Sequence, residues 1–521
     1  MNTKALQTTL WLTCSIFFAW TSFAQGNKAF DFENDIPKQF TSQNANLEIS
    51  TTRYGTGKSS LKWICEPGDK ITYKGEIGFH KSIVDTVIHM HDRDYPQYET
   101  PIALYFWIYN SKITDTELKL SFGRNGSTDC YTRVLLNFEG WRPVNLIYER
   151  GHFIGSPHSD MDECTIEALN GEGAEVYFDN FKFATQELHP LHYFYPQSYL
   201  PTLKLHPERQ SYGAWYVDDS HLNEPWLPLT TPTKKELDDI NTIEKRLLAL
   251  EFDIEPNSPK KKLSNKTMAA IQREFEEIGV VENNGIINGP VYIYDRKTRT
   301  RNNKLMQKMG QLYQSCSNEK QKQELANKII LLYRHGKQVN ISIDWYDGRG
   351  FAAGLYLIRE ELKKQEILDE VVAFIKSRYS FNRIYDETRT MGYMSKGESS
   401  DAISTNLKSE LMTIFMMEDG PEKVRDLKHF SSYLSNVAFN YSPGMRDCLK
   451  PDGSHFHHVT AHHTRYGNYT PSIMGLMTRY MARTSFRVST EAHERLKHHA
   501  RVRYFTTTPK FFPYCMKHIH F

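Results

Sequence analysis

The hydrophobic pattern of this chain changes its period once, and that change constrains the fold more than any other feature. From Phe30 to about Thr185, apolar residues alternate with polar ones or form short runs such as Ile102–Tyr109 and Leu118–Phe122. Glycine and Asn-Gly turns separate these runs, and no helical periodicity accompanies them. The pattern predicts a β-sandwich over residues 25–188, of the jelly-roll-like kind that packs two antiparallel sheets.

After residue 232 the apolar residues recur at helical spacing. Thr233 and Glu236 form a capping box, which predicts a helix that starts there and continues through Leu248. Three later groups of apolar residues each fall on one helical face: Leu325, Ile329 and Leu332; Leu407, Leu411, Ile414 and Phe415; Val424, Leu427, Phe430 and Leu434. Gly420-Pro421 separates the last two groups. We therefore expect an all-α domain over residues 233–521.

Two further segments bound these domains. Residues 189–232 contain repeated prolines and are expected to form a linker. Residues 1–24 combine Lys4, an apolar run from Leu10 to Trp20 and a small residue at Ala24, which is typical of a signal peptide cleaved after Ala24. No later run is long and apolar enough to cross a membrane, so we expect a secreted or periplasmic protein without a membrane partner.

Charge and cysteine usage exclude several classes of protein. The formal net charge of the 521 residues is +2, so no overall field draws the chain to nucleic acid. The cysteines are scattered and show no Cys-x-x-Cys spacing, which argues against a disulfide scaffold and against a zinc site of that type.

Histidine is concentrated near the C-terminus, where ten of the 21 histidines follow residue 454. The densest group begins after Asp452-Gly453 with His455, His457 and His458, and we expect it to lie on a loop. A solvated polar loop, a zinc site and an acid/base site are all compatible with such a cluster, although no His-Glu-x-x-His helix accompanies it.

The acid/base interpretation suits one reaction in particular, the cleavage of a uronate-containing polysaccharide by β-elimination. That reaction removes the weakly acidic C5 proton, protonates the departing glycosidic oxygen and neutralises the uronate carboxylate. Histidine and tyrosine suit the two proton transfers, and both residue types occur in this segment.

Several motifs resemble those of the chondroitin ABC lyase family. They are the segment Lys450–His458, the segment Phe486–Lys497, and the N-terminal segments Phe30–Asn34, Ser60–Trp63 and Phe138–Arg142. The resemblance extends from about residue 30 to 508. It implies an N-terminal β-sandwich followed by an incomplete (α/α) toroid, and a lyase that acts on chondroitin or dermatan sulfate, with hyaluronan as a further candidate.

The same resemblance implies site residues. His458 matches the family's catalytic histidine. Arg465 occupies the position of the catalytic tyrosine, so Tyr466 is the nearest substitute and Tyr469 a second one. The family's catalytic arginine and glutamate have no match before or within Lys510–Tyr514, and we therefore expect a C-terminally incomplete toroid with very low turnover.

The resemblance also implies a calcium ion in the sandwich, held by Asp31, Glu33 and Asp179 together with the carbonyl oxygens of Ser59 and Lys62. Ordinary surface carboxylates are the alternative. No cofactor is implied for catalysis.

Together these observations predict a polysaccharide lyase with a glycosaminoglycan substrate. The alternative is a glycan-binding protein, or an inactive fragment of such a lyase. If the chain is active, replacing His458 should abolish elimination, whereas replacing His455 should have a mild effect.

Overall fold

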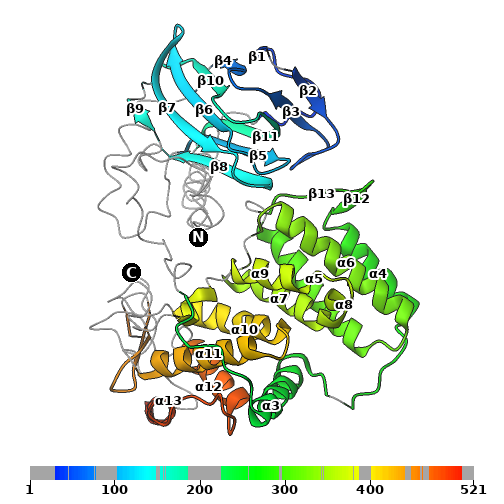
Figure 1. Ribbon diagram of the computed structural model, residues 1–521, viewed down its shortest axis with the longest axis vertical. Helices are drawn as coiled ribbons and strands as arrows, with labels where there is room; N and C mark the ends of the chain where they lie inside the picture. Colours follow the sequence, from blue (N-terminus) through cyan, green and yellow to red (C-terminus); the bar gives the residue numbers. More distant parts are fainter. Residues whose placement is uncertain are drawn as a thin grey trace, which may run out of the picture. The chain divides into compact units, whose positions relative to one another are not determined.

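The computed structural model describes residues 30–44, 46–75, 77, 102–147, 153–156, 158, 160–185, 224–255, 257–292, 296–341, 343, 345–378, 381–385, 400–439, 448–457, 460–461 and 469–506. The chain divides into two compact units, Met1–Ala214 with Gln338–Asn340, and Trp215–Lys337 with Ile341–Phe521. Strands build the first unit and helices dominate the second (Figure 1). The order of a β part followed by a helical part confirms the predicted fold class.

The first unit is a sandwich of two antiparallel sheets. One sheet has the order β1-β4-β10-β6-β7-β9 and the other β2-β3-β11-β5-β8. The strands of both sheets are β1 (Phe40–Gln43), β2 (Asn46–Ser50), β3 (Ser60–Cys65), β4 (Lys70–Lys74), β5 (Ile102–Asn110), β6 (Glu117–Arg124), β7 (Ser127–Leu135), β8 (Gly140–Ile147), β9 (Ile154–Gly155), β10 (Glu163–Ala168) and β11 (Ala174–Thr185).

Aromatic side chains are buried on both faces of the five-stranded sheet. Phe106 and Phe181 stack at 4.8 Å between ring centroids within the sandwich core. On the other face, Tyr177, Tyr109 and Trp141 lie in register across neighbouring strands, and none of the three is more than 4% exposed. The abundant aromatic residues of the sandwich therefore supply packing area here, not open rings for a sugar.

The second unit consists mainly of helices. They are α3 (Lys234–Phe252), α4 (Asn265–Glu276), α5 (Arg296–Ser315), α6 (Glu319–Gln338), α7 (Trp345–Leu357), α8 (Arg359–Lys364), α9 (Leu368–Lys376), α10 (Ser400–Met416), α11 (Pro421–Phe439), α12 (Tyr469–Met481) and α13 (Thr490–Thr506), with a 3₁₀ helix at Phe381–Tyr385. The capping box of Thr233 and Glu236 is present at the start of α3. All residues of the three predicted apolar faces are at most 1% exposed, which confirms those faces.

Two short β elements interrupt the helices, and they correct the all-α prediction for this unit. One is the hairpin of β12 (Val281–Asn283) and β13 (Ile286–Asn288), and the other is a three-stranded sheet of β14 (Cys448–Leu449), β15 (His455–His457) and β16 (Thr460–Ala461). The strands of both elements are so short that their alternating pattern of apolar and polar residues cannot be recognised among helical segments.

Several predicted segments lie outside the described residues. These are the signal peptide at residues 1–24 and the part of the linker from residue 189 to 223. The described cysteines, Cys65, Cys130, Cys164, Cys316 and Cys448, are free and buried, as expected.

Candidate active site

The histidine-rich segment forms a small antiparallel sheet and not the irregular loop that we expected. β14 pairs with β15, and β15 pairs with β16. The turn before β15 closes through two backbone hydrogen bonds between Lys450 and residues Gly453 and Ser454, each 3.0 Å long. Gly453 has a φ of +81°, which L-residues other than glycine rarely adopt. The turn therefore sets where the strand that leads to His458 begins.

His455, the first residue of β15, is buried at 1% exposure. Its Nε2 lies 2.9 Å from the Oγ of Ser400, the first residue of α10. Its ring centroid is 6.5 Å from that of His499 on α13, which is also buried. Replacing His455 should therefore affect stability, because its side chain is buried in the protein. The mild effect on elimination that we expected for this replacement stays a prediction.

Helix α13 supports the other side of the turn. Arg495 donates a hydrogen bond of 3.0 Å from Nη1 to the carbonyl oxygen of Pro451. A Cβ placed on Gly453 would lie 2.6 Å from Val502 and 3.4 Å from His498, so α13 packs directly against this glycine. The turn, the strand and the helix together form a fixed base for the residues that follow β15.

The two residues that we proposed for catalysis, His458 and Tyr466, lie outside the described residues, as does Arg465. In the sequence, His458 comes directly after β15. Tyr469, the second candidate for the tyrosine role, begins α12 and is partly exposed. The roles of these residues remain predictions.

The sequence analysis missed the buried support of this segment, namely His455, Ser400 and His499. Lys450 is also buried, and its Nζ lies 5.3 Å above the ring of Phe456. The Asp-Gly pair at Asp452-Gly453 is the sequence signal that could have indicated a turn followed by a strand, although it does not indicate which side chain of that strand is buried.

A second group of buried polar side chains lines one side of α10. Asn406, Ser409, Glu410 and Thr413 are each at most 5% exposed, and they recur at helical spacing. This polar stripe was not predicted, because the apolar residues of the same helix dominate its pattern.

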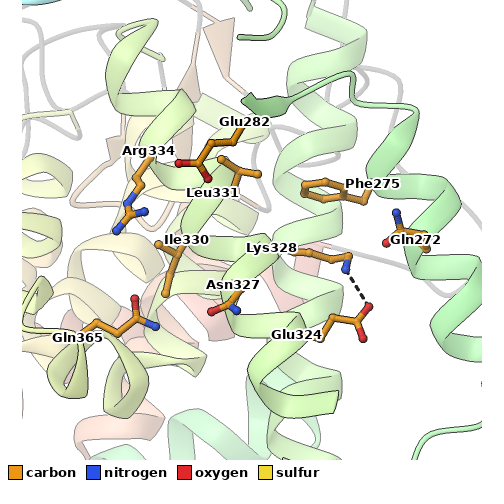
Figure 2. A pocket seen from close by; sticks show the side chains of 10 residues that line it. All are labelled: Gln272, Phe275, Glu282, Glu324, Asn327, Lys328, Ile330, Leu331, Arg334 and Gln365. Carbon is orange, nitrogen blue, oxygen red and sulfur yellow. Dashed lines mark hydrogen bonds and ion pairs between the residues drawn. The ribbon is translucent and has the colours of Figure 1, made fainter. Parts of the chain in front are cut away.

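A separate depression of about 480 Å³ lies in the helical unit and is lined by α4, α6, β12 and the residue after α8. Figure 2 shows Phe275 and Lys328 facing each other across it, with Lys328 paired to Glu324 at 2.8 Å. None of its lining residues belongs to the histidine-rich segment or to the predicted metal site.

In the sandwich, two carboxylates hold the tight loop between residues 55 and 59. Asp179 Oδ2 accepts hydrogen bonds from the main-chain N–H groups of Gly55 and Thr56, both at 2.8 Å. Glu33 accepts from the N–H of Lys58 at 2.9 Å and from that of Ser59 at 3.3 Å. Two of the five predicted metal ligands are therefore brought to one loop.

Burial dominates the electrostatics of Asp179, which is fully buried. Loss of solvent raises its pKa to about 7, and the N–H donors of the loop only partly offset that cost. A carboxyl group with this pKa is partly protonated near neutral pH, unless a bound cation stabilises its charged form.

The remaining predicted ligands have other visible roles. Asp31 is exposed, and its Oδ1 accepts a hydrogen bond from the N–H of Glu33 at 3.4 Å. The hydroxyl of Ser59 donates to the carbonyl of Phe32 at 2.9 Å. Lys62 lies within β3, and its Nζ pairs with acidic side chains on both neighbouring strands.

Over the described ranges, no three His, Cys, Asp or Glu side chains gather in a way that would hold a metal ion. A cation in the sandwich would therefore depend on main-chain oxygens as well. Nor does any helix in the described part of the chain combine the length and apolarity that crossing a bilayer requires.

Comparison with known proteins gives two domain matches. Residues 26–190 match the model of a lyase N-terminal domain, and residues 296–520 match that of a lyase catalytic domain. The two matches cover the sandwich and most of the helical unit, including the histidine-rich segment.

Curated relatives match most of this chain. It is 24% identical to a chondroitin sulfate ABC exolyase of Bacteroides thetaiotaomicron over 90% of its own length and 46% of the relative's. It is 21% identical to a chondroitin sulfate ABC endolyase of Proteus vulgaris over 84% of its length and 45% of the relative's. The chain thus spans about half the length of the curated relatives it matches.

Among solved structures, a chondroitin AC lyase of Streptomyces coelicolor A3 in complex with chondroitin sulphate covers 51% of this chain and 36% of its own, with 12% identity and a TM-score of 0.35.

Proposed function

The chain belongs to the chondroitin ABC lyase family, and on this premise we propose that it cleaves chondroitin- or dermatan-type glycosaminoglycans by β-elimination. The observation that carries the proposal is the anchored strand β15, which directly precedes His458 in the sequence. The first residue of this strand is buried against α10, and α13 packs against the turn before it. Catalytic groups need this kind of rigid support to act at a fixed distance from substrate.

The chemistry assigns a separate task to each residue type. A base removes the C5 proton of the uronate, the electron pair forms the C4–C5 double bond, and the C4–O bond breaks as the leaving oxygen takes up a proton. Neutral imidazole at His458 accepts a proton near neutral pH without large adjustment of its pKa. Tyr466 supplies a hydroxyl for the second transfer, with Tyr469 as the alternative donor.

The test measures the ultraviolet absorbance of the unsaturated product while the full chain is incubated with chondroitin sulfate or dermatan sulfate. We expect absorbance to grow with wild type and to be lost in His458→Ala. His158→Ala, which replaces an exposed histidine of the sandwich, serves as the matched control. Binding of either polysaccharide without any unsaturated product would favour a glycan-binding protein instead.

We also propose that the sandwich binds calcium. Asp179 Oδ1 accepts the hydroxyl of Thr56 at 3.2 Å, and a carboxylate oxygen has room for a further partner in this fully buried position. The carboxylates of Asp31 and Glu33 and the carbonyl oxygens of Ser59 and Lys62 would be the further oxygen ligands, a mixed set that suits a hard cation. A bound cation would stabilise the charged form of Asp179, and its role would be structural.

Calorimetric titration of the EDTA-treated chain with calcium tests this proposal. We expect one binding event in wild type that Asp179→Asn weakens by at least tenfold. Asp160→Asn, an exposed aspartate of the same unit, should bind as wild type does. No heat of binding in wild type would leave the two carboxylates as anchors of the loop alone.

Finally, we propose that the chain is exported and that residues 1–24 are removed, because a charged start, an apolar run and a small residue at position 24 precede the sandwich. Mass spectrometry of the exported chain should find its N-terminus at Gln25. An exported chain that retains Met1 would contradict this.

A further inference from the structure

The exposed side of α13 combines aromatic rings with basic groups next to the candidate active site. We call the α13 face the five side chains Lys497, His498, Arg501, Tyr504 and Phe505. Lys497, Arg501 and Phe505 are four positions apart, and His498 and Tyr504 lie beside them on the helix, so the five side chains form one stripe. The stripe runs along the same helix that supports the turn before β15.

The two aromatic residues of this face are unusually exposed. Tyr504 is 78% and Phe505 81% accessible, higher than any other large hydrophobic residue that the structure describes. Their ring centroids lie 5.6 Å apart in an edge-to-face arrangement, so they form one apolar platform. Isolated exposed apolar residues are ordinary, but two adjacent rings at the edge of a site need a partner to explain them.

The charged residues of this part of α13 are all basic. From Arg495 to Thr506, the helix contains four Lys or Arg residues and no Asp or Glu. Lys497 pairs with Glu494 at 2.6 Å, and the exposed Arg501 interacts with the same carboxylate only through its charge. Cations are favoured near the C-terminus of a helix by its dipole, which accounts for their sign, but the dipole does not account for the exposed rings beside them.

The face is continuous with the histidine-rich segment. His498 lies beside Gly453, and Arg495, six residues before Arg501, hydrogen-bonds to Pro451. A polymer that is bound along this turn therefore meets the α13 face next.

We propose that the α13 face binds an anionic polysaccharide as an extension of the candidate active site. Arg501 and Lys497 would neutralise sulfate or carboxylate groups, His498 would offer a ring nitrogen for a hydrogen bond, and Tyr504 and Phe505 would stack on pyranose rings. The occupant follows from charge complementarity together with open rings, since sulfated uronate polymers present both fixed anions and flat sugar faces. This inference rests on the proposed function for the identity of the polymer.

The test uses the full chain carrying His458→Ala, so that binding is measured without turnover. Fluorescence anisotropy with a labelled chondroitin sulfate oligosaccharide gives the dissociation constant over a range of salt concentrations. Arg501→Glu should weaken binding about tenfold at low salt and flatten its salt dependence, because each neutralised anion releases counterions. Replacing Tyr504 and Phe505 together by Ala should weaken binding about three- to tenfold at every salt concentration.

Matched controls lie elsewhere on the helical unit. Arg273→Glu replaces an exposed arginine of α4, and Leu229→Ala replaces a side chain that is 54% exposed. Binding by Arg501→Glu that equals binding by Arg273→Glu would overturn the inference, as would a chain that does not bind the oligosaccharide at all.

The same variants separate this inference from the proposed function. With His458 intact, Arg501→Glu should raise KM for chondroitin sulfate and leave kcat unchanged. If wild type releases unsaturated product and Arg501→Glu keeps the wild-type KM, the lyase assignment stands, and the proposal that the α13 face binds the polysaccharide is wrong. If wild type binds through the α13 face but releases no product, the binding surface stands and the lyase assignment fails.

Discussion

The Nε2 of His455 lies 2.9 Å from the Oγ of Ser400, and this contact joins the first residue of β15 to the first residue of α10. Both residues are at most 1% exposed. A buried hydrogen bond between two elements that are 55 residues apart fixes the strand in position, because either polar group would be costly to bury alone.

Replacing His455 by Ala should lower the free energy of unfolding by about 2–4 kcal/mol, since it removes a buried ring and leaves the Ser400 hydroxyl without this partner. His493→Ala, at an exposed position of α13, should change stability by less than about 0.5 kcal/mol. Urea unfolding followed by circular dichroism measures both. Equal stabilities of the two variants would show that the buried contact is energetically unimportant.

Replacing Gly453 by Ala should also destabilise the chain, by about 1–3 kcal/mol. The residue has a φ of +81°, and the new Cβ would lie 2.6 Å from Val502. Gly475→Ala is the control, because that glycine lies inside α12 with open space around it. The control should gain about 0.5–1 kcal/mol from the better helix propensity of alanine. The prediction fails if both substitutions shift the thermal midpoint in the same direction.

The pKa of Asp179 predicts how the stability of the sandwich depends on pH. Burial raises this pKa from 3.8 to about 7, so between those values the folded chain binds a proton that the unfolded chain releases. The contribution of Asp179 to stability is therefore highest at or below about pH 4 and falls as pH rises to 7. The protection factors of β3 and β11, which correct hydrogen-exchange rates for their intrinsic pH dependence, should decrease over this range in calcium-free buffer. Asp179→Asn should abolish that part of the pH dependence, and pH-independent protection factors in wild type would count against the raised pKa.

His335 predicts the opposite pH dependence for the helical unit. It is fully buried on α6, with Nδ1 3.2 Å from the hydroxyl of Tyr292, and burial lowers its pKa to about 4. Below pH 6.5, His335 therefore binds a proton in the unfolded chain but not in the folded chain. The free energy of unfolding consequently falls as pH decreases from 6.5 to 4. The protection factors of α6, which correct hydrogen-exchange rates for their intrinsic pH dependence, should decrease over this interval. In His335→Gln the part of this decrease that is attributable to the group should disappear, and its persistence would assign the effect to other residues.

Periodicity in the sequence was sufficient for the large-scale architecture. Leu407, Leu411 and Phe415 identify the buried side of α10, and the capping box of Thr233 and Glu236 marks the start of α3, because both signals depend on residues within a few positions of one another. The motif Lys450–His458 likewise identified the segment at the centre of the candidate site.

The support of that segment was decided by tertiary structure. His455 and Ser400 lie far apart in sequence, and nothing in the local pattern shows that the side chain of His455 is buried. The same holds for Asp179 and the loop at Gly55, whose contact spans 124 residues. Side-chain chemistry and local period are properties of the chain itself, whereas burial, pKa and the partner of a buried polar group arise only when distant segments exclude water from one another.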